Sequence, residues 1–421
     1  MVFDIIIIGA GASGLAAAFQ AAGSSEKLNI LVLEKEKIPG RKLSAAGNGK
    51  CNLANRQLDA SCYHSKNRTV LSDWINEHSH QEITAFFEQM GILLYEADGY
   101  YYPKSNQGKQ VTALLCEKCK QMGVQFLFEN KVIKLQWQQD HICEVTASDK
   151  ENTAAVYRAK NIILAAGGLA APKLGGSDAG YQLLSGLGMK LQPIYPALSP
   201  VYMEDSLLKL AKGVRLDAVV TLKKPDGTGI KEKGQVQFNE NCLSGIVIMN
   251  LSCYLNKWAD DVQDASLFLD VLPELTWDAL KSYFLEQQQR FPEEILLQLL
   301  NGILPERFSI YIAKRLHLDR DERIKNLSEK QINRITSALK KLTFTPVHCQ
   351  DYDKAQVTGG GLDLGEIQID TFESVKYPGL YVTGELLDVN GKCGGYNLTF
   401  AILSGIKAAE IIVKKYGDVA L

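Results

Sequence analysis

The sequence has no excess of charge of either sign and no long basic block. Its 46 Lys and Arg residues face 48 Asp and Glu residues, which gives a formal net charge of −2 at pH 7. Nucleic acids and anionic membranes bind clustered cations, so this balance predicts neither as a partner. Hydrophobic residues make up 46% of the 421 positions, an ordinary share that excludes a disordered or fibrous protein.

Uninterrupted apolar runs long enough to span a bilayer are also lacking. Residues 5–22 come nearest, but Asp4 precedes them where a signal peptide carries basic residues, and three glycines interrupt them. The nine cysteines are scattered and odd in number, which is typical of reduced thiols and not of a disulfide framework. We therefore expect a cytoplasmic protein with no membrane partner, and the sequence indicates no oligomeric state.

Internal repeats, low-complexity tracts and flexible linkers are absent from a chain whose length suggests two or three domains. The first third alternates β-like and helix-like runs, which is typical of a parallel sheet covered by helices. Strand-like pieces follow from about residue 190, and apolar residues at three- and four-residue spacing then predict helices over 276–342. Sheet-like runs return at 343–347 and 379–383, before a last helix over 397–416.

A glycine-rich turn follows the first strand-like run, residues 3–8. It reads GAGASG over residues 9–14 and opens an alanine-rich helix over 12–22. In a dinucleotide-binding fold, Gly9 makes the turn, Gly11 lets the backbone approach a pyrophosphate, and Gly14 lets the helix pack on the strand. The N–H groups at the helix N-terminus then face the phosphates.

The turn also has the context that a lone glycine motif lacks. A second strand-like run ends at Glu34, twenty residues after Gly14. A carboxylate at this place accepts hydrogen bonds from both hydroxyls of an adenosine ribose. The alternative is a structural turn with a glutamate on the surface. The full pattern favours dinucleotide binding, but it does not separate NAD from FAD.

A resemblance to a known family separates the two cofactors. Residues 35–52 read KEKIPGRKLSAAGNGKCN, which resembles the glycine-rich flavin loop of the BaiN-like, aminoacetone-oxidase-type family of FAD-dependent oxidoreductases. The similarity extends over the whole chain through YYP at 101–103, LAAGG at 164–168, GSDAG at 176–180, VTGGG at 357–361, GLYVTGELLD at 379–388 and GGYN at 394–397. Ala166 and Glu385 depart from the Thr and Asp that related flavoproteins usually carry.

The resemblance implies an α/β fold. A Rossmann-like FAD-binding domain of the glutathione-reductase type would be assembled from both chain ends, with an inserted β-barrel-like domain and a small helical domain. The expected boundaries are 1–190 and 353–421 for the FAD-binding domain, 191–272 and 343–352 for the β-rich insert, and 273–342 for the helical insert.

The resemblance also assigns residues to FAD. Those expected around the adenosine and pyrophosphate are Gly9, Gly11, Ala12, Ser13, Gly14, Glu34 and Lys35, with backbone contacts to adenine from Val132. Those expected on the flavin side are Arg41, Lys42, Asn48, Gly49 and Asn52. Gly384 and Glu385 would meet the ribityl chain and pyrophosphate, and Ala166 and Gly167 belong to the same cofactor site.

Asn397, Leu398 and Thr399 are assigned to the pyrimidine end of the flavin ring. This assignment has a physical reason besides the resemblance. A reduced flavin carries negative charge near N1 and O2, and the N-terminus of the last predicted helix offers free N–H groups and a positive dipole end. The alternative is that Gly394 and Gly395 only pack this helix against the sheet.

We therefore expect an enzyme that moves a hydride between a small organic substrate and N5 of FAD. The favoured activity is oxidation of an aminoacetone-like amine by oxygen. The alternatives are reduction of a conjugated ketone or steroid-like substrate, with NAD(P)H as a transient reductant, and a non-catalytic flavin-binding regulatory or interaction protein. Tyr101 and Tyr396 are candidates for the substrate pocket, with core packing as the alternative. The catalytic residues stay unknown, and no metal site is predicted.

The cysteines have ordinary structural explanations. Cys116 and Cys119 have redox-motif spacing, but they lie inside a helix-like run. Cys51 and Cys393 fall in flavin-loop motifs without the cysteine spacing of flavin-linked disulfide reductases, so their redox role is left open.

Overall fold

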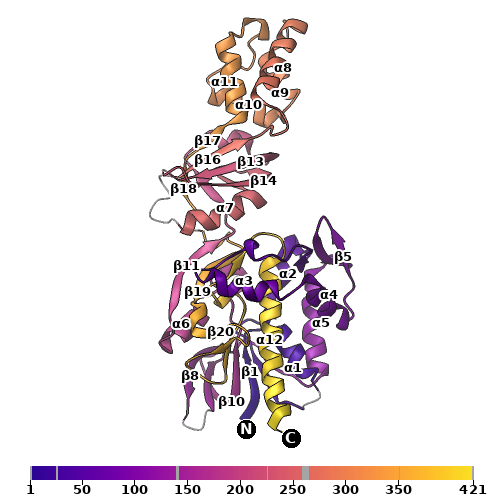
Figure 1. Ribbon diagram of the computed structural model, residues 1–421, viewed down its shortest axis with the longest axis vertical. Coiled ribbons are helices and arrows are strands. Elements are labelled where there is room, and N and C mark those ends of the chain that lie inside the picture. Colours follow the sequence, from indigo (N-terminus) through magenta and orange to yellow (C-terminus); the bar gives the residue numbers. More distant parts are fainter. Residues whose placement is uncertain are drawn as a thin grey trace. The chain divides into compact units, whose positions relative to one another are not determined.

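The computed structural model describes residues 2–24, 27–138, 142–224, 226–257, 265–349 and 351–419. The chain divides into two compact units, one of Met1–Tyr195 with Gln356–Leu421 and one of Pro196–Ala355 (Figure 1). Each unit has its own hydrophobic core. The first unit is therefore built from both ends of the chain, and the second is inserted into it.

In the described part of the first unit, nine strands form one sheet. They are β1 Val2–Ile8, β2 Ile30–Leu33, β7 Gln125–Leu127, β8 Lys131–Trp137, β9 Cys143–Ser148, β10 Ala154–Leu164, β20 Ile367–Gln368, β21 Glu373–Ser374 and β22 Leu380–Val382. The parallel strands stand in the order β22-β10-β1-β2-β7. β9 and β8 extend the sheet in antiparallel fashion from the first half of β10.

The central strands are apolar along their whole length because helices cover both faces of a parallel sheet. Ile5, Ile6 and Ile7 of β1 are completely buried. Helix α1 (Ala12–Ala22) spans the residues that the sequence predicts, so this prediction is confirmed. It contacts α5 (Gly108–Gln121) and the last helix.

The last helix, α12 (Tyr396–Val419), confirms the predicted C-terminal helix. Figure 1 shows it beside α1, so the two chain ends meet here. A Cβ on Gly405 would lie 2.3 Å from the carbonyl oxygen of Ser13, so the two helices approach very closely. By length and composition α12 could cross a membrane, but 56% of its apolar window is buried inside the unit. Burial against α1 explains its apolar character.

The first unit also contains shorter elements. The helices are α2 Arg41–Ala45, α3 Arg68–Asn76, α4 His80–Gln89 and α6 Ala179–Gly186. The strands are β3 Ala54–Asn55, β4 Tyr63–His64, β5 Leu94–Ala97, β6 Tyr100–Pro103, β11 Leu191–Ala197, β19 Val357–Leu362 and β23 Asn390–Gly391. β3, β6 and β5 pair in that order, as do β23 with β4 and β11 with β19.

In the described part of the second unit, seven antiparallel strands pair in the order β17-β16-β13-β14-β15-β12-β18. They are β12 Val201–Met203, β13 Arg215–Lys223, β14 Gly229–Phe238, β15 Cys242–Ser244, β16 Ser266–Asp270, β17 Leu342–Phe344 and β18 Pro346–His348. β17 and β18 end this order, so the described pairings leave the sheet open. α7 (Ile246–Lys257) packs on β14.

The remaining helices of the second unit are α8 Trp277–Arg290, α9 Leu296–Asn301, α10 Glu306–Arg315 and α11 Glu329–Lys340. The helices predicted over 276–342 are therefore confirmed. α11 begins at a capping box, in which the N–H of Ser328 donates to Gln331 at 2.8 Å and the N–H of Gln331 donates to Ser328 at 3.3 Å. Arg315 ties the helices to the sheet, because it pairs with Asp205 and donates to the carbonyl oxygen of Thr343 at 2.5 Å.

Candidate cofactor site

The three glycines of the first turn meet different surroundings. Gly9 has a φ of +103°, and a Cβ there would lie 2.5 Å from the carbonyl oxygen of Ala165. A Cβ on Gly14 would lie 1.9 Å from the carbonyl oxygen of Gly9. By contrast, a Cβ on Gly11 would meet no described atom within 4 Å. Packing therefore requires Gly9 and Gly14, whereas Gly11 leaves open space in front of the turn.

That open space lies at the N-terminus of α1. Gly11 is the N-cap residue, and among the described residues no side chain caps this end. The first N–H groups of a helix have no partner within the helix and carry its positive dipole end. The turn can therefore hold a phosphate through Ala12 and Ser13 without a lysine.

Glu34 stands directly after β2 and is 8% exposed. Its Oε2 accepts a hydrogen bond from the N–H of Ala10 at 2.6 Å, and its Oε1 accepts one from the N–H of Glu36 at 2.8 Å. Burial raises the pKa of Glu34 against the lowering effect of these two bonds. The N–H of Asn130 donates to the carbonyl oxygen of Glu34 at 2.9 Å, which brings the start of β8 and Val132 alongside.

Lys35 and Arg41 both pair with Glu36. The Nζ of Lys35 lies 3.0 Å from Glu36, and Arg41 reaches the same carboxylate while donating to the carbonyl oxygen of Lys173 at 2.6 Å. Burial acts to raise the pKa of Glu36, but the bonds from Lys35 and Arg41 hold it below its ordinary value. The two predicted cations thus form one network that joins α2 to the loop around Lys173.

Lys42 forms an ion pair with Glu385, which lies near the other end of the chain. Its Nζ lies 2.9 and 2.7 Å from the two carboxylate oxygens. The N–H of Thr358 donates to Oε1 of Glu385 at 2.9 Å. A Cβ on Gly168 would lie 2.4 Å from the hydroxyl of Thr358 and 2.5 Å from this carboxylate. Four distant segments therefore meet at one charged group.

The segment before Glu385 lies against the start of α1. The hydroxyl of Ser13 donates to that of Thr383 at 2.7 Å, and the N–H of Gly384 donates to the hydroxyl of Ser404 at 3.0 Å. A Cβ on Gly384, whose φ is +70°, would lie 3.2 Å from that of Ser13. Ala166 and Gly167 follow shortly after β10, and a Cβ on Gly9 would lie 3.1 Å from the Cα of Ala166. The predicted residues Ser13, Ala166 and Gly384 therefore lie close to the first turn.

The predicted flavin loop runs in an unusual backbone conformation. Gly47, Asn48, Gly49 and Cys51 have φ values of +56°, +55°, +86° and +65°. Non-glycine residues rarely adopt such values, and they cluster where a backbone is shaped for a ligand. Oδ1 of Asn52 is buried with no hydrogen-bond partner among the described residues. Buried acceptors normally have a donor, so this oxygen fits a cofactor N–H or O–H.

The residues at the N-terminus of α12 act differently from one another. The side chain of Asn397 accepts from the N–H of Gly391 and donates to its carbonyl oxygen, both at 2.8 Å. It therefore clamps the preceding loop, which leaves the backbone N–H groups of the helix end for a ligand. Thr399 is buried and donates to the carbonyl oxygen of Leu53 at 3.5 Å, while Leu398 is half-buried.

Tyr396 lies in an aromatic cluster with Tyr100, whereas the other candidate, Tyr101, lies elsewhere. A Cβ on Gly394 would lie 3.1 Å from both the Tyr100 and Tyr396 rings. Tyr101 points elsewhere and stacks on His80 at 5.3 Å between ring centroids. Successive residues of β6 face opposite sides, so only one of the two tyrosines can lie beside Tyr396. That residue is Tyr100.

Burial raises the pKa of Tyr396, which also has a hydrogen bond with Cys62. The hydroxyl of Tyr63 donates to the carbonyl oxygen of Tyr396 at 2.9 Å. The prediction of site residues missed Thr358, Thr383, Tyr63 and Cys62. Thr358 and Thr383 lie in motifs that carry the family resemblance, and this was the signal that could have found them.

The cysteines of the site are protonated at neutral pH where burial is strong. Burial raises the pKa of Cys51 to about 12, and that of Cys119, inside α5, to about 12 as well. Cys393 is partly exposed. Within the described ranges, no group of three or more His, Cys, Asp or Glu side chains could hold a metal ion.

The residues around the turn fit FAD. Open space faces Gly11 at a helix N-terminus, a buried carboxylate stands at Glu34, and an unpartnered oxygen stands at Asn52. These features suit a pyrophosphate, a ribose and a flavin. Gly11, Ala12, Ser13 and Glu34 would hold the adenosine half, and the 47–52 loop with the start of α12 would hold the flavin half.

Comparisons with known proteins agree with this fold and with FAD as the cofactor. The family profile described as "HI0933-like protein Rossmann domain" matches residues 3–411. The chain is 31% identical to the 3-dehydro-bile acid delta(4,6)-reductase of Clostridium scindens, over 97% of this chain and 98% of that protein. It is 27% identical to the ribosomal RNA dihydrouridine synthase of Escherichia coli, over 98% of each chain.

Its fold is similar to that of the 3-ketosteroid delta1-dehydrogenase from Sterolibacterium denitrificans, with a TM-score of 0.54, 13% identity, and coverage of 98% of this chain and 100% of that one. The predicted Rossmann-like FAD-binding fold and the predicted FAD cofactor are confirmed. The chain belongs to the HI0933-like family of Rossmann-fold, FAD-binding proteins and is an FAD-dependent oxidoreductase.

Proposed function

We propose that this enzyme reduces a carbon–carbon double bond conjugated to a carbonyl group, with NAD(P)H as the source of electrons. The observation that carries the proposal is the chemistry shared by two relatives that cover the whole chain. One is named as a delta(4,6)-reductase of a 3-dehydro-bile acid, and the other as a dihydrouridine synthase. Uridine has a ring double bond next to its C4 carbonyl, and a 3-dehydro group is a ketone beside the 4 position.

The reaction adds one hydride and one proton across the double bond, and NAD(P)H becomes NAD(P)⁺. When bound, FAD supplies the hydride through N5. The chain itself has to position the alkene, polarise the carbonyl group and exclude water. These tasks need neutral hydrogen-bond donors beside the flavin end of the site.

Tyr396 and Tyr100 suit these tasks. Burial raises the pKa of both phenols, so both keep their protons at neutral pH. A protonated phenol can donate to a carbonyl oxygen or supply a proton to carbon. Both rings lie at Gly394, immediately before α12. This arrangement supports a reductase, in which the protein acts as an acid.

Oxidation of an aminoacetone-like amine by oxygen, the activity that the sequence favoured, is the alternative. Such an oxidation needs a neutral amine, and therefore a group that accepts a proton. Phenols with raised pKa values are poor acceptors at neutral pH. The chemistry at Tyr396 and Tyr100 thus favours the reductase over the amine oxidase.

Anaerobic spectroscopy of the FAD-loaded protein tests the proposal. We expect NADH or NADPH to bleach the visible flavin absorbance, and a steroid with a 3-oxo-4-ene group to restore it. Mass spectrometry should find two added hydrogen atoms in the steroid. Bleaching by aminoacetone, together with no restoration of colour by the steroid or by uridine-containing RNA, would contradict the proposal.

A pair of tyrosine variants tests the role of the phenol. We expect Tyr396→Phe to slow restoration of the colour by about 100-fold or more, because a general acid contributes at least that factor. The bleaching by NAD(P)H should change little, since it needs no proton from the chain. Tyr101→Phe is the matched control, because that ring stacks on His80. Equal rates for the two variants would remove Tyr396 from the mechanism.

A further inference from the structure

The second unit carries a row of cations on the outer side of α11. Lys330 and Arg334 are one helical turn apart, and Lys341 follows two turns later, directly after the helix. With 3.6 residues per turn, all three fall on one face. The opposite face is apolar and buried in the core through Ile332, Ile335 and Leu339. We call Lys330, Arg334 and Lys341 the α11 cation row.

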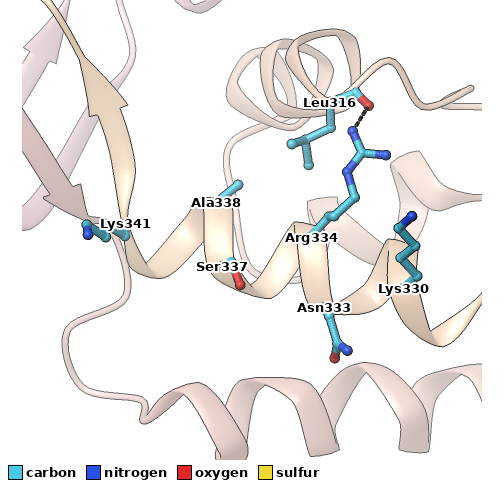
Figure 2. Close-up of a pocket in the computed structure, with 7 residues that line it drawn as sticks. All are labelled: Leu316, Lys330, Asn333, Arg334, Ser337, Ala338 and Lys341. Atoms are coloured by element: carbon cyan, nitrogen blue, oxygen red, sulfur yellow. Dashed lines mark hydrogen bonds between the residues drawn. The ribbon is translucent and has the colours of Figure 1, made fainter.

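Figure 2 shows the row around a shallow pocket that Leu316, Asn333, Ser337 and Ala338 also line. No residue that lines this pocket carries a carboxylate. The guanidinium Nη2 of Arg334 donates to the carbonyl oxygen of Leu316 at 2.8 Å. This bond holds the guanidinium in place and leaves its other N–H groups available. The pocket is therefore positively charged and partly preorganised.

The row lacks carboxylate partners, in contrast to several other cations of the same unit. Among the described residues, Lys330, Arg334 and Lys341 form no ion pair. Nearby cations do form such pairs, namely Lys281 with Glu329, Arg323 and Lys325 with Glu293, and Lys340 with Asp270. Three uncompensated cations on one face attract a polyanion, whereas paired cations do not.

Polar and aromatic groups flank the row. The indole N–H of Trp277 donates to the hydroxyl of Ser337 at 3.1 Å, which leaves the proton of that hydroxyl free to donate. Oδ1 of Asn333 is buried with no hydrogen-bond partner among the described residues, so it can accept from a hydroxyl group. The Nζ of Lys341 lies 4.7 Å from the centre of the Phe268 ring, and both Trp277 and Phe268 are partly exposed.

We propose that this face of α11 binds RNA. The cation row would contact phosphates, Asn333 and Ser337 would reach hydroxyl groups of the ribose, and Trp277 and Phe268 would offer rings for stacking bases. The row spans about 16 Å, a length of a few nucleotides. The inference deepens the proposed function and rests on it, because uridine in RNA is one carbonyl-conjugated alkene that such an enzyme could reduce.

RNA fits the face better than an anionic membrane does. A helix that binds a membrane surface inserts an apolar face between the lipids. The apolar face of α11 is already buried in the core of the unit, at Ile332, Ile335 and Leu339. What remains for a partner is a narrow row of charge with polar and aromatic neighbours, which matches a nucleic-acid strand.

Fluorescence anisotropy with the full FAD-loaded chain tests the proposal. The probe is a short fluorescein-labelled single-stranded RNA of mixed sequence. The variant is Lys330→Gln/Arg334→Gln/Lys341→Gln. We expect it to bind the probe at least about tenfold more weakly at about 50 mM KCl, and its log–log salt slope to be smaller by about 2, because each phosphate contact on a single strand contributes about 0.7.

Two further variants separate charge on this face from charge in general. Lys212→Gln/Arg323→Gln/Lys325→Gln removes the same number of charges from ion-paired positions of the same unit, and it should bind within about twofold of the wild type. Lys330→Arg/Arg334→Lys/Lys341→Arg keeps the charge and should retain the binding. Thermal unfolding of each variant shows whether its fold is intact.

The proposal is overturned if the Lys330→Gln/Arg334→Gln/Lys341→Gln variant binds RNA as tightly as the wild type does. It is also overturned if the folded wild-type protein does not bind RNA at about 50 mM KCl. The proposal is overturned as well if the wild type sediments with phosphatidylserine vesicles and the triple Gln variant does not, while the two bind RNA equally. Reduction of the 3-oxo-4-ene steroid is measured on the same samples. If RNA binding requires the α11 cation row but the steroid is not reduced, the RNA-binding face is supported, and reduction of uridine in RNA is tested next. If uridine in RNA is not reduced either, the proposed reductase function is refuted, whereas RNA binding by this face of α11 is not.

Discussion

Replacing Glu34 by Gln tests the adenosine end of the cofactor site at nearly constant shape. Both carboxylate oxygens already accept backbone bonds, from Ala10 at 2.6 Å and from Glu36 at 2.8 Å. Each oxygen has a second lone pair, and these are available to the ribose hydroxyls. In Glu34→Gln one oxygen becomes an NH₂ group, which cannot accept. One backbone N–H or one ribose hydroxyl therefore loses its acceptor, and the others lose a charged partner.

A hydrogen bond to a charged group contributes about 1.5–3 kcal/mol. Loss of one such bond should therefore raise the dissociation constant of FAD by about 10- to 150-fold. Glu34→Ala, which removes both oxygens, should lose at least as much affinity. Titration of the apoprotein with FAD, followed by flavin fluorescence, measures the dissociation constant.

Stability should respond to Glu34→Gln differently from affinity. Burial raises the pKa of Glu34 above its ordinary 4.5, so the folded apoprotein holds this proton more tightly than the unfolded chain does. The resulting stabilisation is fully present below pH 4.5 and is lost as the pH rises through the raised value. At neutral pH the buried charge is a cost that glutamine removes. Urea unfolding of the apoprotein at neutral pH should therefore show no loss of stability in Glu34→Gln.

Glu410→Gln is the matched control. Its pKa is also raised, with desolvation as the main cause, and this carboxylate on α12 accepts a bond from Gln20 at 3.3 Å, away from the glycine-rich turn. Its affinity for FAD should stay within about twofold of the wild type, because no ribose bond is lost. An unchanged dissociation constant in Glu34→Gln, or a loss of affinity matched by an equal loss of stability, would refute the assigned role.

Three other predictions follow from the same unit. Gly14→Ala should lower the unfolding free energy of the apoprotein by about 1–3 kcal/mol, because its Cβ would lie 1.9 Å from a carbonyl oxygen, whereas Gly11→Ala should keep the stability and weaken FAD binding. Similar urea midpoints for the two would contradict this difference. Lys42→Met leaves Glu385 without its cation and should lower the unfolding free energy by about 1–2 kcal/mol. Lys160→Met, at the more exposed ion pair with Asp4, should lower it by less than about 1 kcal/mol. A larger loss of stability in Lys160→Met than in Lys42→Met would contradict the greater contribution of the Lys42–Glu385 pair. Burial raises the pKa of Cys51 from 9.0 to about 12. The folding free energy that the buried, protonated thiol contributes is therefore present below pH 9 and is lost as the pH rises toward 12. Iodoacetamide at mildly alkaline pH should label Cys393 in the native protein and Cys51 only after unfolding. Mass spectrometry that finds Cys51 labelled in the native protein would contradict that burial.

The features that the sequence predicted well are local ones. The run from β1 through Gly9, Gly11 and Gly14 into α1 follows from strand and helix patterns with glycines at a fixed spacing, and Glu34 follows at a fixed distance along the chain. Neighbouring residues decide such features, so their pattern is visible before the chain folds.

The pairs that the sequence did not predict join distant segments. Lys42 and Glu385 were assigned to different parts of the cofactor, yet they form one ion pair, and Thr358 joins them. Tyr100 lies beside Tyr396, whereas Tyr101 stacks on His80. The sequence contains both tyrosines, but only the register of β6 decides which of them faces the site.

The sequence by itself determined the class of fold, the dinucleotide turn and the family, because short motifs at fixed spacing carry each of them. Only the tertiary structure decided which charges compensate one another. A net charge of −2 describes the whole chain, and it argued against a nucleic-acid partner. Folding pairs several cations of the inserted unit with carboxylates, among them Lys281, Lys325 and Lys340, and leaves Lys330, Arg334 and Lys341 together on one face of α11. Such a local surplus of charge depends on which side chains share a surface, and composition does not contain that information.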